Sequence, residues 1–215
     1  MTTTKDIRAG KIAALTGSVV LVASPARAAP SGPFADILQI IDNLTSYLPN
    51  FMTMLGVIFY ILGIILVIIA LRGLGRRSEM GPGMGTYTPH VVKLIIGIFF
   101  VAFPAFETVL SFAFLGAPVE SDPNQIFAYA PSLTAPFTGE GGSAARQVVS
   151  ALTAIIMFVG VIAIARGLFV LNLAAQGTAA GGGPGVGSGI TFLIAGIMAA
   201  NFPLFMRVVE ALVAP

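Results

Sequence analysis

Four long apolar segments constrain this chain more than any other feature. They cover residues 51–71, 91–115, 148–171 and 188–213, and each reaches the ~20 residues that a helix needs to cross a bilayer. In lipid the backbone must satisfy its own hydrogen bonds, so each segment is predicted to be a helix. Only 9% of the residues are charged, against about 25% in soluble proteins. The fold class predicted is therefore an all-α membrane protein with four transmembrane helices.

Residues 1–28 have the pattern of a cleavable signal peptide. Basic residues precede a short apolar run at 12–24, and Ala26 and Ala28 then form a small-x-small cleavage site. An uncleaved short anchor is the alternative. This leader holds four of the eleven basic residues, so the net charge of +2 does not predict nucleic-acid binding.

Residues 29–50 are predicted to form an outer amphipathic helix. Apolar side chains such as Phe34, Leu38 and Ile41 recur at helical spacing, with polar residues elsewhere around the helix, and Pro49 is expected to end it. The polar face is not basic, which argues against binding to anionic lipid. We expect it to pack on neighbouring helices or on a partner, or to serve as an ordinary entry helix.

Charges in the connections predict the orientation in the membrane. Arg72, Arg76 and Arg77 follow the first apolar segment and Lys93 begins the second, whereas the Pro- and Gly-rich connection at 116–147 is acidic. Basic connections remain in the cytoplasm. The sequence thus predicts a membrane protein whose basic connection is cytoplasmic and whose mature termini both lie on the outer side.

Two stretches of the chain are nearly the same. GIFFVAFPAFETV at 97–109 and GIMAANFPLFMRV at 196–208 share six of thirteen residues, including a Phe-Pro pair. An Arg-Gly-Leu triplet and a Gly-Pro-Gly-x-Gly loop precede each stretch, in the same order. This series predicts two tandem hairpins, 51–115 and 148–215, that enter the membrane from the same side and form a parallel repeat.

Small residues and prolines in the repeat are the candidate helix-packing or kink positions. Gly97 and Gly196 would let helices approach closely, as assembly in lipid favours. Pro104 and Pro203 interrupt helical hydrogen bonding in register.

The two repeats also place opposite charges at nearly the same depth. Glu107 aligns beside Arg207, which predicts an ion pair across the second and fourth helices. The alternative is that Arg207 pairs with Glu210 on its own helix, at i, i+3.

No catalytic, cofactor or metal site is predicted. The chain has no cysteine, and its single histidine, His90, has no ligand-type residue at suitable spacing. The Gly-rich loops lack the lysine and the preceding strand of a P-loop. An enzyme is not expected. A small transporter or channel subunit is the alternative, although ionisable residues within the apolar segments are few.

A signal peptide, two spans, a basic cytoplasmic loop and two outer ends are the layout of conjugative pilin precursors, and this chain looks like two such hairpins in tandem. The stretch AAQGTAAGGGPGVGSGITFLIAGIMAANF at 174–202 resembles the IcmC/DotE group of integral inner-membrane proteins from Dot/Icm secretion systems and IncI-type conjugation. The resemblance implies a structural, non-catalytic subunit of a type IV secretion or conjugation apparatus. Its implied partners are the lipid bilayer and other subunits of the machine, in an oligomer.

Overall fold

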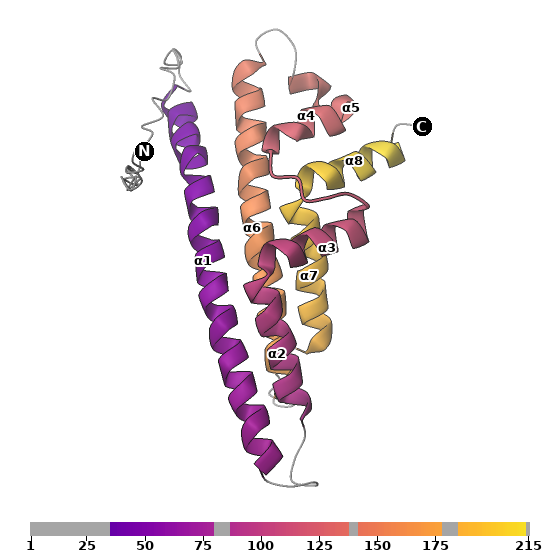
Figure 1. Ribbon diagram of the computed structural model, residues 1–215. Coiled ribbons are helices and arrows are strands. Elements are labelled where there is room, and N and C mark those ends of the chain that lie inside the picture. Colours follow the sequence, from indigo (N-terminus) through magenta and orange to yellow (C-terminus); the bar gives the residue numbers. More distant parts are fainter. Residues whose placement is uncertain (1–34, 80–86, 138–141, 178–184, 214–215) are drawn as a thin grey trace, which may run out of the picture.

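The computed structural model describes residues 35–79, 87–137, 142–177 and 185–213, and there the chain consists of helices joined by short connections (Figure 1). The longer helices, in chain order, are α1 (Ala35–Glu79), α2 (Thr88–Val101), α3 (Phe103–Leu115), α6 (Ser143–Ala175), α7 (Val186–Ala200) and α8 (Phe202–Val213). The predicted signal peptide and the Gly-rich loop at 81–85 lie outside the described residues.

Helices α1 and α6 are the two longest and lie side by side (Figure 1). They contain 45 and 33 residues, or about 68 and 50 Å of helix, which exceeds the ~30 Å hydrocarbon core of a bilayer. Both are long and apolar enough to cross a membrane. Their N-termini lie at the same end of the molecule, so α1 and α6 run in the same direction.

The other two apolar segments are each broken into two helices. Helices α2 and α3 meet at 95°, and α7 and α8 meet at 87°. The described chain therefore has two candidate spans, or up to four if each bent pair crosses as one unit. The prediction of one continuous helix for 91–115 and another for 188–213 is wrong. Helices α3 and α8 project to the same side of the molecule, away from α1 (Figure 1).

The breaks occur immediately before the two Phe-Pro pairs. Ala102 and Asn201 leave helical geometry, with φ/ψ of −101°/34° and −111°/43°. Pro104 and Pro203 have no N–H to donate to the preceding turn, and their rings collide with the carbonyl four residues back. Proline is well accommodated in the first turn of a new helix, so each Phe-Pro pair begins one.

A third proline has no such effect. Pro49 lies inside α1, which continues from the predicted amphipathic region into the first apolar segment. The prediction that a separate outer helix ends at Pro49 is wrong. One proline removes a single helical hydrogen bond, and a long helix tolerates that loss where neighbouring groups compensate.

The core lies where α1, α2, α6 and α7 meet. Phe59 of α1 contacts the rings of Phe100 and Phe103, at centroid distances of 5.7 and 4.7 Å. Ile164 of α6 and Ile197 of α7 are fully buried in the same cluster. Because Phe103 belongs to the first Phe-Pro pair, its burial fixes the start of α3 against α1.

The acidic connection at 116–147 is partly helical. Its described residues, 116–137 and 142–147, include four short helical turns: η1 (Pro123–Gln125), α4 (Ile126–Tyr129), α5 (Pro131–Thr134) and η2 (Ala135–Phe137). Helix α6 already begins at Ser143, before the predicted boundary at 148. The turns α4 and α5 lie beyond α8, at the end of the molecule where α6 begins (Figure 1). We call this end the outer end, following the predicted orientation.

Candidate functional site

Helices α1 and α2, the first hairpin, approach each other closely at two glycines. A Cβ at Gly63 of α1 would lie 2.6 Å from the Val101 nitrogen and 2.8 Å from the Gly97 carbonyl oxygen. A Cβ at Gly97 would lie 2.9 Å from a Val67 methyl group. These distances are too short for a real side chain, so the crossing of α1 and α2 depends on both glycines. The candidate packing role of Gly97 therefore has a defined contact.

Helices α6 and α7, the second hairpin, also approach each other closely at two glycines. A Cβ at Gly160 of α6 would collide with the backbone nitrogen of Ala200 and lie 2.6 Å from the Ala199 carbonyl carbon. A Cβ at Gly196 would lie 2.7 Å from the Ile164 nitrogen. Glycine allows the backbones of α6 and α7 to touch, as small residues do at helix crossings in membranes.

The prolines of the two Phe-Pro pairs have different surroundings. Pro203 is buried beside Asn201 in the core, whereas Pro104 is exposed. Both break their helix, but only Pro203 also contributes buried packing area.

The predicted topology-setting residues lie at the end of the molecule opposite the outer end. Arg76 and Arg77 occupy the last turn of α1, Arg72 precedes them, and Lys93 lies in α2, whose start faces that end (Figure 1). His90 packs against Gly73, and no hydrogen-bond partner reaches its buried Nδ1 atom within the described chain. This end of the described chain carries a concentration of positive charge.

A polar network joins the acidic connection at 116–147, which we call the outer connection, to the break between α7 and α8. Asn201 is fully buried, and its Oδ1 atom accepts a 3.0 Å hydrogen bond from the backbone N–H of Glu120. The Glu120 carboxylate accepts 3.0 and 3.1 Å hydrogen bonds from the Asp122 N–H and the Tyr129 hydroxyl. Burial, and then the hydrogen bond to Glu120, raise the pKa of the Tyr129 hydroxyl. The two partners Asn201 and Glu120 lie 81 residues apart in the sequence, so spacing along one helix does not predict their contact.

The structure does not join the predicted charge pair. Among the described residues no ion pair is recorded between Glu107 and Arg207, or between Arg207 and Glu210. The Arg207 guanidinium instead lies over the Tyr129 ring, 5.7 Å from its centroid. The Glu210 carboxylate accepts a 2.9 Å hydrogen bond from the Ser132 N–H. Both side chains of α8 are therefore directed to the turns of the outer connection.

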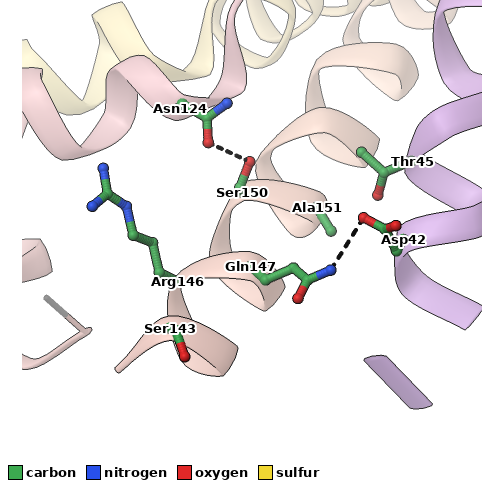
Figure 2. A pocket seen from close by; sticks show the side chains of 8 residues that line it. All are labelled: Asp42, Thr45, Asn124, Ser143, Arg146, Gln147, Ser150 and Ala151. Carbon is green, nitrogen blue, oxygen red and sulfur yellow. Dashed lines mark hydrogen bonds between the residues drawn. The ribbon is translucent and has the colours of Figure 1, made fainter. Parts of the chain in front are cut away.

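A polar pocket of about 430 Å³ opens at the outer end between α1, η1 and α6 (Figure 2). Gln147 donates a 3.1 Å hydrogen bond to Asp42, and Ser150 donates a 3.0 Å hydrogen bond to Asn124. Arg146 also lines this pocket. Sequence reasoning did not single out these residues, because they come from three separate segments.

The chemistry available at these sites is hydrogen bonding, charge and close packing. Within the described ranges, no group of three or more His, Cys, Asp or Glu side chains is placed to hold a metal ion. In comparisons with known proteins, the chain matches no family model, no curated protein and no solved structure.

Proposed function

We propose that this protein is a structural, non-catalytic membrane subunit of a bacterial type IV secretion or conjugation apparatus. The observation that carries the proposal is the close contact between α6 and α7 at Gly160 and Gly196. Gly196 and the alanines that Gly160 contacts belong to the stretch 174–202 that resembles the IcmC/DotE group. The small residues of that stretch would then serve to pack helices, which is a scaffolding role and needs no catalytic group.

We further propose that the chain is a duplicated hairpin. Gly63 and Gly97 lie at a close contact of one helix pair, and Gly160 and Gly196 occupy the corresponding positions of the other. The second helix of each pair bends at the residue before its Phe-Pro pair, by 95° and 87°. Matching contacts and matching bends support one ancestral hairpin used twice in parallel orientation.

The proposed setting is the bacterial inner membrane, with the basic end in the cytoplasm and both mature termini in the periplasm. Helices α1 and α6 would cross completely. Helix α2, with 14 residues, is about 21 Å long and shorter than the ~30 Å hydrocarbon core. We therefore propose that α3 and α8 complete the two bent pairs close to the outer interface, where Arg207 and Glu210 reach polar surroundings.

Partner subunits would bind in the membrane, and the projecting helices offer them a surface. Val109, Phe112 and Phe114 of α3 are exposed, on the side of the molecule to which α8 also projects (Figure 1). Both helices carry apolar side chains away from the four-helix core. An oligomer, or a complex with other membrane subunits, would cover this area.

The test is deletion of the coding gene in its natural host, with complementation from a plasmid. We expect loss of DNA transfer or protein secretion at unchanged growth, with recovery by the intact gene and by Gly56→Ala. Gly56 has open space around its Cβ position, so it controls for the substitution itself. Gly160→Leu should not complement. Unchanged transfer together with lost uptake of a solute would instead support a transporter.

A further inference from the structure

The polar pocket at the outer end is lined by side chains whose chemistry suits a particular ligand. It lies between the N-terminal parts of α1 and α6 and the turn η1. Figure 2 shows Arg146 and Asp42 on opposite sides, with Gln147 and Ser150 between them. A volume of about 430 Å³ is within the range of small-molecule sites. Opposite charges on two walls of one pocket suit a ligand that itself carries both signs.

Arg146 provides the positive side. Its guanidinium lies over the ring of Phe127, 4.5 Å from the centroid. A guanidinium attracted to the face of an aromatic ring retains its N–H donors for other partners. No ion pair of Arg146 is recorded with any part of the described chain. An oxyanion with several oxygens, such as a phosphate, would satisfy these donors in a forked arrangement.

Asp42 provides the negative side. One of its oxygens accepts the hydrogen bond from Gln147, and a carboxylate can accept several bonds at once. Asp42 makes a further interaction besides this one, and the ammonium group of a ligand would join these partners at the carboxylate. The Ser150 hydroxyl, held by Asn124, lies between the two charges (Figure 2).

In a membrane crossed by α6, the pocket would lie at the depth of lipid headgroups. Arg146 and Gln147 occupy the first turns of α6, and the long apolar part of this helix, which is a candidate membrane span, follows directly. The side chains that line the pocket are thus at the boundary between the polar and the apolar parts of α6. Phospholipid headgroups occupy that boundary.

We propose that this pocket binds the headgroup of a zwitterionic phospholipid, with the phosphate at Arg146 and the ammonium group at Asp42. Phosphatidylethanolamine has the required pair of charges, whereas phosphatidylglycerol has the phosphate alone. The proposal depends on insertion of α6 in a membrane and not on a role in secretion, so failure of the secretion test leaves it standing.

The experiment uses the full-length protein in detergent, with lipid binding counted by native mass spectrometry during titration with either phospholipid. We expect the wild type to prefer phosphatidylethanolamine. Arg146→Gln should weaken binding of both lipids by about tenfold or more, since a charge-assisted hydrogen bond is lost. Asp42→Asn should remove the preference and retain binding of phosphatidylglycerol.

Arg166→Gln is the matched control, because Arg166 makes the same kind of contact with Phe192, 4.9 Å from its ring centroid, away from the pocket. It should bind lipid as the wild type does. Arg146→Lys, which keeps the charge and loses the fork, should give an intermediate affinity and serves if Arg146→Gln does not fold. Unchanged binding in Arg146→Gln, or a preference that survives Asp42→Asn, would overturn the proposal.

A final arm separates a lipid from a free phosphate compound. Soluble phosphoethanolamine and inorganic phosphate are added as competitors at equal concentration. Weak competition by phosphoethanolamine, and none by inorganic phosphate, is expected for a lipid site. Complete displacement of the lipid by inorganic phosphate in the wild type, absent in Arg146→Gln, would make the pocket a phosphate site and overturn the lipid assignment.

Discussion

The backbone N–H of Glu120 donates a 3.0 Å hydrogen bond to the Oδ1 atom of Asn201. Asn201 is fully buried and is the non-helical residue between α7 and α8, and its Nδ2 atom donates to the Ile197 carbonyl at 3.2 Å. One side chain therefore joins the break between α7 and α8 to the acidic connection at 116–147.

Replacing this side chain tests its role. Asn201→Ala should lower the free energy of unfolding by ~1–3 kcal/mol, because the half-buried Glu120 N–H loses its partner. Chemical unfolding of the purified protein in mild detergent measures the change. Asn43→Ala, at an exposed position of α1, should have little effect. Equal losses in both variants would contradict a specific role for Asn201.

The glycine contacts predict a sharp difference between two positions in the long helices. Gly160→Ala should destabilise the protein by ~1–3 kcal/mol, because the added methyl group overlaps the backbone at Ala200. Gly56→Ala meets nothing within 4 Å and should be neutral, or stabilising by up to ~1 kcal/mol through higher helix propensity. Thermal unfolding of both variants measures the difference. Similar stability in the two would show that α6 and α7 do not touch at Gly160.

The Tyr129 hydroxyl predicts a pH dependence at the alkaline end. Burial, and then its hydrogen bond to Glu120, raise its pKa above 10.0. Above pH 10.0 the unfolded chain releases this proton before the folded chain does, so the free energy of unfolding falls as pH rises. The contribution is complete below pH 10.0 and is lost as pH rises through the folded-state pKa.

Tyr129→Phe removes this ionisable group. Between about pH 9 and about pH 11.5, the free energy of unfolding of this variant should decline less steeply than that of the wild type. Stability curves of both proteins over that range give the comparison. Tyr47→Phe, on an exposed side chain of α1, should follow the wild type. Parallel curves for wild type and Tyr129→Phe would count against the raised pKa.

Charge reversal tests the relationship of Glu107 and Arg207. No ion pair joins these two side chains, and Arg207 lies over Tyr129. The double variant with Glu107→Lys and Arg207→Glu should therefore not recover the stability that each single substitution loses. The change in unfolding free energy of the double variant should equal the sum of the changes in the two single variants within ~0.5 kcal/mol. A rescue larger than that would establish the cross-repeat pair.

Single cysteines test the proposed orientation, since the natural chain has none. Ser78→Cys lies on the exposed last turn of α1 and Ser132→Cys on an exposed turn of the outer connection. An impermeant maleimide applied from the periplasmic side should label Ser132→Cys and leave Ser78→Cys unlabelled. The reverse pattern would invert the topology.

The sequence alone determined the class of structure. Apolar segments 51–71 and 148–171 predicted helices long enough to span a membrane, because lipid leaves the backbone no other hydrogen-bond partners. These segments lie within α1 and α6, both candidate spans. Gly97 and Gly196 were also identified from the sequence as small residues at matching positions, and the structure gives each a close backbone contact.

Only the tertiary structure decided what each proline does. Pro49, Pro104 and Pro203 each remove one helical hydrogen bond, yet α1 continues while α2 and α7 end. The local loss is the same, so the outcome depends on what the following residues can bury. Phe103 packs on Phe59 after the first break, and Pro203 and Leu204 are buried after the second.

The partners of the polar side chains were likewise beyond reach of the sequence. Asn201 and Glu120 are 81 residues apart, and Asp42 and Gln147 are 105 apart. A hydrogen bond forms only where folding brings donor and acceptor to about 3 Å with suitable angles. Sequence spacing fixes such distances along one helix but not between helices, so Arg207 could be assigned a depth but not its position over Tyr129.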